Sequence, residues 1–338
     1  MGSKNRKLDA LARDELLETR MCELGLELQG TWVEPLVERV LTELDHHEIT
    51  HRPHFWLADE WFSPDGVPGV AVPFYLAHKR LMELERTQMY EVEGGTRREC
   101  LMLLRHEVGH AIDTAYHLSR RKRWRALFGS PATPYPDYYR PRPGSKRFVQ
   151  HLGGWYAQSH PAEDFAETFA VWLDPRSRWR TRYKGWKALK KLEYVDELMA
   201  DIAGRRPKPK SRAKPYSLPK LRHTLRTHYE RKRSHYGVGY SEAYDADLTR
   251  LFAAGVGGGY PTAASLLRRR RRLIRERVAR WTGAYEFAVD QFLKEVGGRC
   301  KELGLRVKDN EDEVINEFCV MLAVHVTHHL RASTWHPM

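Results

Sequence analysis

The stretch His106-Glu107-Val108-Gly109-His110 decides how this sequence is interpreted. Residues 98–105 before it include a run of four apolar side chains, which predicts a buried helix. In a helix the two histidines are four residues apart and lie on one face. Two imidazoles so placed can hold one zinc ion, with Glu107 close enough to act on a water there. The motif therefore predicts a zinc site, although five residues alone also occur in unrelated proteins.

A catalytic zinc site needs a third protein ligand and keeps a fourth position open. The metzincin pattern requires glycine and histidine three and six residues after His110, where this chain has Asp113 and Tyr116. His117 shares the helix face, but seven residues of helix span about 10 Å, which is too far to share the ion. The third ligand is therefore expected from another segment.

Residues 162–173 predict a second helix that carries paired carboxylates. Its apolar residues recur at helical spacing, a proline suits its first turn, and Asp174-Pro175 ends it. Glu163 and Glu167 are four residues apart and share a face. By residue type and spacing, Glu163, Glu167 or Asp164 can supply the third ligand.

The two segments also match a known pair of motifs. Residues 106–113 read H-E-V-G-H-A-I-D, and residues 163–169 read E-D-F-A-E-T-F. This resembles the catalytic domain of anthrax-lethal-factor-like zinc metallopeptidases, of the gluzincin type, where an H-E-F-G-H-A-x-D helix is followed by an E-F-F-A-E-x-F helix. In that family the first glutamate of the second helix binds zinc, and a tyrosine seven residues earlier points at the site. The resemblance covers residues 98–175 and does not reach the last third of the chain.

The resemblance implies a role for each matching residue. His106, His110 and Glu163 would hold one zinc ion per chain. Glu107 would take a proton from water as general base and pass it to the leaving amine. Tyr156, seven residues before Glu163, would donate its hydroxyl proton to the developing oxyanion. The implied activity is hydrolysis of a peptide bond in a protein or peptide substrate.

Two further carboxylates, Asp113 and Glu167, are expected behind the zinc ligands. A carboxylate that accepts the second ring N–H of a ligating histidine fixes the tautomer and orientation of that ring. Gly109 has no side chain, which leaves room for close packing against its helix. The plainer alternatives are that these histidines and carboxylates form an ordinary helix surface and that Tyr156 only packs.

The fold class predicted is α+β and predominantly helical, with a small edge sheet in a zincin-like domain. Residues 8–47 predict helix, whereas Phe55–Leu57 and Val70–Leu76 predict strands. Turn residues at 63–66 allow these strands to form a hairpin over the zinc helix. Pro73 marks the second strand as an edge, to which an extended substrate can add.

The chain divides into three predicted segments. Residues 1–203 form the zincin-like metallopeptidase domain, 204–219 a basic, proline-rich linker, and 220–338 a basic, all-helical C-terminal region. The helices predicted in that region span residues 240–254, 262–296 and 311–330. Residues 130–146 are rich in proline and tyrosine, which predicts a loop that can line the cleft between the ligand helices.

Basic residues are in excess, with 57 Lys and Arg against 44 Asp and Glu and a formal net charge of +13. They concentrate at residues 120–123, 205–215 and 268–272. Such clusters can bind nucleic acid or another polyanion by counterion release, but charge runs more often form a solvated helix face. A polyanion is therefore only a secondary expected partner. The corresponding alternative function is a nucleic-acid-associated protease localised by its C-terminal helices.

A second alternative is a zinc-binding regulatory protein without catalytic activity, although the presence of Glu107 and Tyr156 favours an enzyme. No apolar run approaches the ~18 residues of a membrane span, and the charged residues 1–6 are unlike a signal sequence. The four cysteines are widely spaced and form no C-x-x-C pair, as expected for buried thiols. These features predict a cytoplasmic protein without a membrane partner. The substrate and the oligomeric state do not follow from the sequence.

Overall fold

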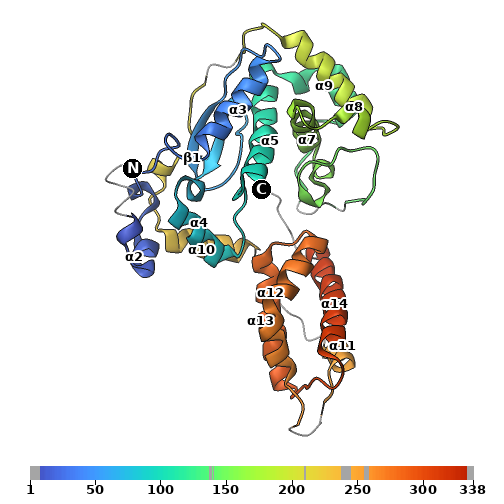
Figure 1. Ribbon diagram of the computed structural model, residues 1–338. Coiled ribbons are helices and arrows are strands. Elements are labelled where there is room, and N and C mark those ends of the chain that lie inside the picture. Colours follow the sequence, from blue (N-terminus) through green and yellow to red (C-terminus); the bar gives the residue numbers. More distant parts are fainter. Residues whose placement is uncertain are drawn as a thin grey trace. The chain divides into compact units, whose positions relative to one another are not determined.

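The computed structural model describes residues 8–136, 139, 141–208, 211–236, 245–254 and 259–332, the last without the side chains of 328–332. Over these residues the chain is a predominantly helical α+β protein with one small parallel sheet (Figure 1). It divides into two compact units. Of the described residues, those up to Glu85 and those from Val92 to His228 belong to the first unit, and Arg86–Glu91 and those from Tyr229 onward belong to the second. None of the described helices is long and apolar enough to cross a membrane.

The first unit contains all the residues of the predicted zinc site. Its elements are α2 (Arg13–Glu18), η1 (Met21–Glu23), α3 (Glu34–Asp45), β1 (His54–Ala58), β2 (Gly69–Pro73), η2 (Phe74–Ala77), α4 (Lys79–Met89, which runs into the second unit), α5 (Arg97–Tyr116), η3 (Leu118–Arg120), α6 (Lys122–Phe128), η4 (Gly153–Gln158), α7 (Pro161–Leu173), α8 (Trp179–Arg182), α9 (Leu189–Ile202), η5 (Leu218–Lys220) and the start of α10 (Leu225–Tyr236).

Helix α5 runs through the middle of this unit, between α3 and α7 (Figure 1). It begins where the Thr96 hydroxyl accepts a hydrogen bond from the Glu99 amide at 3.2 Å, a side-chain N-cap. It ends at His117, whose left-handed backbone terminates the helix. Apolar side chains on several faces are buried, so α5 is a core helix as the sequence predicts.

Helix α7 begins at a second side-chain cap. The His160 ring accepts a hydrogen bond from the Ala162 amide at 3.1 Å, and Pro161 occupies the first turn, where its missing N–H costs nothing. The helix ends before Asp174, and almost every residue in it is buried. Two capped, buried helices therefore carry the motif residues.

The two strands pair in parallel, with Phe55 opposite Val70 and Leu57 opposite Val72, so the hairpin interpretation is wrong. The turn at residues 63–66 does reverse the chain, but it lies within the segment that connects the two strands. Phe62, just before this turn, forms an antiparallel bridge with Ala71 in β2. The second strand also ends at Pro73, because residues 74–77 form a 3-10 turn.

The helix predicted over residues 8–47 is interrupted. Among the described residues, 8–10, 13–18 and 34–45 are α-helical, and a short 3-10 turn lies between the last two helices. Gly25 and Gly30 adopt positive φ angles of 60° and 75°, which an α-helix does not allow. Apolar residues between the last two helices lie in a turn and pack into the core. Their spacing along the sequence is similar to that in a helix, which explains the prediction.

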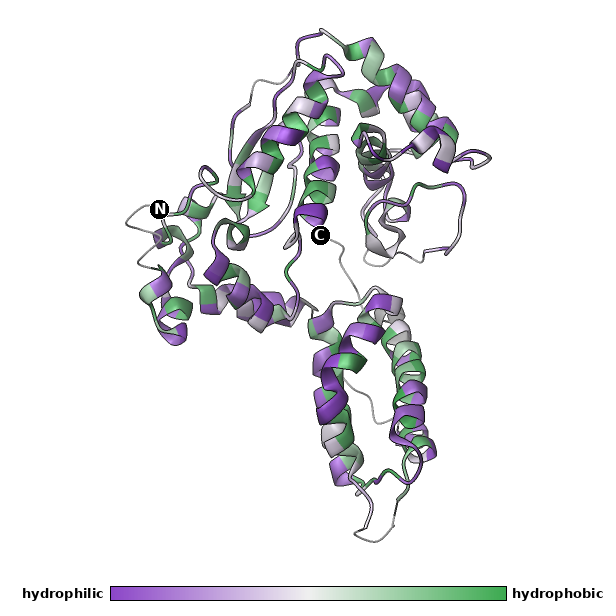
Figure 2. Ribbon diagram, viewed as in Figure 1, coloured by the Kyte–Doolittle hydropathy of each residue, from purple (hydrophilic) through white to green (hydrophobic). Residues whose placement is uncertain are grey.

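The second unit is helical in its described residues. Besides the end of α10 it contains α11 (Asp245–Leu251), α12 (Ala263–Thr282), α13 (Glu286–Glu302) and α14 (Glu311–Ala332). The helix predicted over 262–296 is wrong, because Gly283 at φ 74° ends α12 and the chain restarts as α13. In the predicted helix 240–254, residues 240–244 lie outside the description. Figure 2 shows hydrophilic and hydrophobic residues alternating in bands along these helices.

The hydrophobic bands of α12, α13 and α14 form the core of this unit, in which Phe292, Phe318 and Leu266 are fully buried. The hydrophilic bands hold the arginine run, whose members pair with carboxylates. These ion pairs are Arg269–Glu311, Arg270–Asp312, Arg271–Asp290 and Arg272–Glu276. Four of the five arginines at residues 268–272 therefore have a carboxylate partner within the second unit.

Candidate metal centre

The zinc-helix motif and the carboxylate helix meet at Gly109. A Cβ atom added to Gly109 would lie 3.1 Å from Ala166 Cα and 3.1 Å from Phe169 Cδ1, so α5 and α7 touch there at backbone distance. Only glycine allows this approach without a shift of one helix. Because His106 and His110 flank Gly109 while Glu163 and Glu167 flank Ala166, the close crossing brings the four side chains together.

Three of these side chains converge on one point. His106 Nε2 lies 3.0 Å from Glu163 Oε2, His110 Nε2 lies 3.2 Å from the same oxygen, and the two Nε2 atoms are 3.2 Å apart. A tetrahedral zinc ion with bonds of about 2.0–2.1 Å separates its ligand atoms by about 3.3 Å. The three potential ligand atoms therefore have the mutual spacing of three corners of a zinc tetrahedron.

The hydrogen bonding of His106 indicates that a cation belongs between these atoms. His106 Nδ1 lies 3.0 Å from Glu167 Oε1, and a carboxylate can only accept, so Nδ1 carries the proton. In neutral His106, Nε2 then presents a lone pair to the Glu163 carboxylate and to His110. Two acceptors at this distance repel, unless a proton, such as one on His110 Nε2, or a metal ion lies between them. The donor set of two imidazoles and one carboxylate fits zinc.

The burial and the charge of these residues also indicate that a cation belongs at this site. All three side chains are largely or fully enclosed. Burial lowers the pKa of His106, but Glu163 and Glu167 outweigh it and raise that pKa well above its ordinary value. Burial raises the pKa of Glu163, but His110 and His106 outweigh it and hold that pKa well below its usual range. The site therefore favours positive charge, which a metal ion supplies without protonating the ligands.

The alternative third ligands are engaged elsewhere. Asp164 points away from the histidines and pairs with Lys191 Nζ at 2.5 Å, in a buried contact. One oxygen of Glu167 accepts a hydrogen bond from His106 Nδ1, and the other accepts one from the Leu152 amide at 2.9 Å. Glu163 is the carboxylate that reaches both histidine Nε2 atoms, and Glu167 occupies the place behind His106 that orients its ring.

Asp113 is hydrogen-bonded to the chain after α5; burial raises its pKa, and the charge of His110 opposes that rise. Its Oδ1 accepts the Ser119 amide at 2.7 Å, a contact that closes the turn after α5. Within the described residues its hydrogen-bond partner is therefore the turn and not a ligand histidine. A role behind the ligand histidines remains a prediction for Asp113.

Glu107 is buried at the same site, with 7% of its surface exposed, and its Oε2 has no hydrogen-bond partner in the described structure. Burial raises the pKa of Glu107, while His106 and His110 lower it. A buried carboxylate oxygen without a partner is costly to keep. Such an atom at a metal site is available to accept a proton.

Tyr156 packs beside His106, with 5.6 Å between the ring centroids. It lies in η4, where Gly154 and Trp155 adopt positive φ angles of 65° and 55°. This turn directs the tyrosine back over α5. Burial raises the pKa of Tyr156 well above its ordinary value, and Glu163 adds to this effect, so the phenol keeps its proton.

A second tyrosine, which sequence reasoning missed, reaches the site from the loop before η4. The Tyr135 hydroxyl donates to Glu163 Oε1 at 2.7 Å, while the other oxygen of Glu163 faces the histidines. The Tyr135 ring stacks on His160 with 3.8 Å between centroids, and His160 caps α7. The loop expected over residues 130–146 therefore contacts a candidate ligand directly. Its richness in proline and tyrosine was the available signal.

A buried ion network, also missed, fixes the two helices in register. Arg105 precedes the first motif histidine and is 3% exposed. It donates to both carboxylate oxygens of Glu43 in α3, at 2.8 and 2.7 Å, and lies 3.2 Å from Asp174 at the end of α7. One guanidinium therefore joins α3, α5 and α7.

The comparison with known families agrees with this geometry. Residues 75–202 match the model of a family described as "Putative zinc-binding metallo-peptidase". The matched range covers α5, α7, η4 and every residue of the candidate site. No curated protein and no solved structure matches the chain. The match supports a zinc metallopeptidase, and the possible metal site of His106, His110 and Glu163 agrees with it.

Proposed function

We propose that the chain is a zinc-dependent endopeptidase or peptidase of the gluzincin type, with one zinc ion held by His106, His110 and Glu163. The observation that carries this proposal is the convergence of these three ligand atoms at 3.0–3.2 Å, together with the buried Glu107, whose Oε2 has no hydrogen-bond partner in the described structure. The family match to residues 75–202 supports it independently.

Each surrounding residue has a role in this proposal. A zinc ion held there would lower the pKa of a water and polarise the substrate carbonyl. Glu107 accepts a proton on Oε2 and returns it to the leaving amine. Tyr156 keeps its proton and donates a hydrogen bond to the oxygen where negative charge develops. Glu167 holds His106 in the tautomer that leaves Nε2 free for the metal.

The lethal-factor-like subtype is part of the proposal and rests on the order of motifs along the chain. An aromatic residue in η4, seven positions before the third ligand, packs against the first histidine. An extended substrate at the edge of β2 is less well supported. All five residues of β2 are buried, and the Ala71 amide already donates to the Phe62 carbonyl at 2.8 Å. A substrate strand would have to displace Phe62.

A measurement of zinc content tests the site. Elemental analysis of the purified chain should give one zinc per chain, lost in both His110→Ala and Glu163→Ala. His117→Ala is the matched control, because that histidine follows the same helix but lies beyond reach of the ion, so zinc should be retained. Zinc lost with His110→Ala but kept with Glu163→Ala would reject Glu163 as the third ligand. A parent protein that takes up no zinc would reject the metal centre.

The Glu107→Gln variant separates an enzyme from a zinc-binding regulatory protein. Cleavage of an unstructured peptide library, read by mass spectrometry, should fall by about 10³-fold or more, since the general base is lost while binding is kept. The variant should still contain one zinc per chain. Equal cleavage by parent and variant would refute Glu107 as the base. No cleavage by a zinc-loaded parent would favour the non-catalytic alternative.

A further inference from the structure

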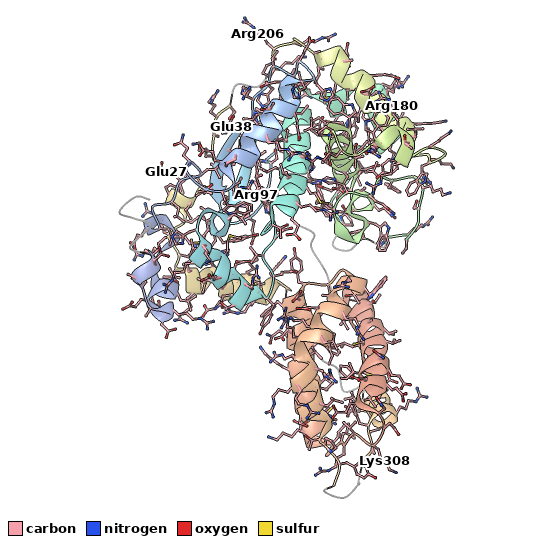
Figure 3. The ribbon with its side chains drawn as sticks, viewed as in Figure 1. Glu27, Glu38, Arg97, Arg180, Arg206 and Lys308 are labelled. Carbon is pink, nitrogen blue, oxygen red and sulfur yellow. The ribbon has the colours of Figure 1, made fainter. Side chains whose placement is uncertain are left out.

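Two basic runs that lie far apart in the sequence meet in one cavity of the first unit. Arg120 and Arg121 follow helix α5, and Arg205, Arg206 and Lys208 follow helix α9. All five line a cavity of about 320 Å³, whose remaining wall includes Tyr116, His117 and Ile202. Arg206 lies at the surface of the molecule (Figure 3). The cavity is separate from the metal centre, because it lies at the far end of α5.

The backbone of this cavity is held in place by hydrogen bonds. The Tyr116 hydroxyl donates to the Arg205 carbonyl at 3.1 Å, and the Lys208 amide donates to the Ala115 carbonyl at 3.0 Å. Tyr116 and Ala115 belong to the last turn of α5. The backbone of the segment after α9 is therefore attached to the end of α5, which places its cations around the cavity.

The charge in the cavity is only partly compensated. Asp201 binds Arg121 at 2.7 Å and Arg205 at 2.6 Å, which uses one negative charge for two cations. The side chains of Arg120, Arg206 and Lys208 make no ion pair within the described part of the chain. Burial lowers the pKa of His117, and Arg120 and Lys208 lower it further, while Asp113 opposes them. Positive charge therefore surrounds His117.

We propose that this cavity is a binding site for a small oligophosphate, with charge concentrated on adjacent phosphate groups. Guanidinium groups form paired hydrogen bonds with phosphate oxygens, and several of them converge here from two segments. The volume is at the lower end of the range for ligand pockets, which fits a compact anion. This proposal does not depend on the proposed peptidase activity.

The backbone of a nucleic acid is the competing ligand. It would need a stripe of cations that extends beyond one cavity, since each phosphate is contacted separately. In this chain the longest basic run, at residues 268–272, is paired with carboxylates for four of its five members. In the cavity, by contrast, five cations from two segments surround one small space and share a single carboxylate, which favours the oligophosphate.

Isothermal titration calorimetry with inorganic tripolyphosphate on the full-length protein tests the proposal. One molecule should bind per chain at low salt, and Arg206→Gln/Lys208→Gln should weaken binding about tenfold or more, because two charge-assisted contacts are lost. These side chains are exposed and make no ion pair in the described structure, so the variant should fold normally. The matched control is Lys187→Gln/Lys190→Gln, which removes the same charge near the other end of α9 and should change affinity less than twofold.

Tripolyphosphate also binds metal ions, so the titration is repeated with His110→Ala. Binding that persists in this variant, and is lost with Arg206→Gln/Lys208→Gln, is at the cavity and would stand even if the peptidase proposal failed. The proposal is overturned if the parent shows no binding, or if binding is lost only with His110→Ala. It is also overturned if Arg206→Gln/Lys208→Gln binds like the parent. A single-stranded oligonucleotide that binds more tightly than tripolyphosphate, with the same dependence on Arg206 and Lys208, would assign the cavity to nucleic acid.

Discussion

The α5–α7 pair and the helices of the second unit both bury carboxylates, but with opposite partners. Asp290 in α13 is completely buried among cations: Arg271 bonds it at 2.6 Å, and Arg275 and Lys294 lie 3.6 Å away. Glu163 in α7 is 5% exposed and faces two imidazole nitrogens, which carry positive charge only when they are protonated or bind a metal ion, while the neighbouring Glu107 Oε2 has no hydrogen-bond partner in the described structure.

The difference distinguishes a structural ion cluster from a ligand site. Around Asp290 the opposite charges are supplied by the chain itself, so the cluster is complete and requires nothing further. Around Glu163 the chain supplies imidazoles, which have no permanent charge, so the positive charge has to come from a proton or a metal ion. Burial alone therefore does not identify a functional carboxylate, whereas the sign of its neighbours does.

Substitution of Asp290 by Asn should have the largest effect in this comparison. Three cations would lose their buried partner, so the free energy of unfolding should fall by about 3–5 kcal/mol. Urea denaturation followed by circular dichroism measures this change, and the zinc content should be unaffected. Asp312→Asn, which breaks an exposed pair with Arg270, should cost less than about 1 kcal/mol. Equal losses in the two variants would contradict the importance of burial.

Substitution of Glu167 by Gln should weaken zinc binding by about 10- to 100-fold, because the amide no longer holds the His106 proton as a carboxylate does. The dissociation constant can be measured by competition with a chromophoric chelator. Glu197→Gln serves as the control, since Glu197 is exposed and pairs with Arg123. If Glu167→Gln binds zinc as the parent does, Glu167 does not position His106.

The Gly109→Ala substitution tests the helix crossing without changing a ligand. Its methyl group would meet the backbone of Ala166, and overpacking of about 1 kcal/mol corresponds to about fivefold weaker zinc binding. Gly297→Ala in α13 is the matched control. No atom lies within 4 Å of its added Cβ, so zinc affinity should not change and the helix should become slightly more stable. Unchanged zinc affinity in Gly109→Ala would show that the crossing tolerates a methyl group.

Tyr135→Phe should give the smallest effect. It removes one hydrogen bond to Glu163, while both histidine contacts of Glu163 are kept. Zinc affinity should therefore fall only about threefold. The same chelator competition measures it. A loss as large as that of Glu167→Gln would mean that the loop, and not only α5 and α7, holds the metal ligands in place.

The ligand helices could be predicted from sequence because the features that define them lie within each helix. His106 and His110 share a face by helical spacing, and Glu163 lies in a capped, periodic segment. The predominantly helical α+β class is confirmed. The domain limits predicted at 203 and 219 remain a prediction, while the compact units in the structure divide near residue 228.

The features that escaped prediction depend on contacts between distant segments. Nothing in residues 130–146 specifies that the Tyr135 hydroxyl reaches Glu163, because a loop has no periodicity to place it. The link from Arg105 to Glu43 spans 62 positions and joins two helices. The parallel strands were mistaken for a hairpin because turn residues show that the chain reverses but not which segment then pairs. The break at Gly283 lies inside an otherwise continuous helical pattern.

The contact at Gly109 has a consequence for ionic radius. A cation such as calcium binds oxygen at about 2.3–2.6 Å, so its ligand atoms must lie farther apart than those of zinc. To admit it, α5 and α7 would have to separate and lose the contact between Gly109 and Ala166. The size of the ion that fits is therefore determined partly by a residue that never touches it, and a bulkier side chain at this position should shift the preference toward larger ions.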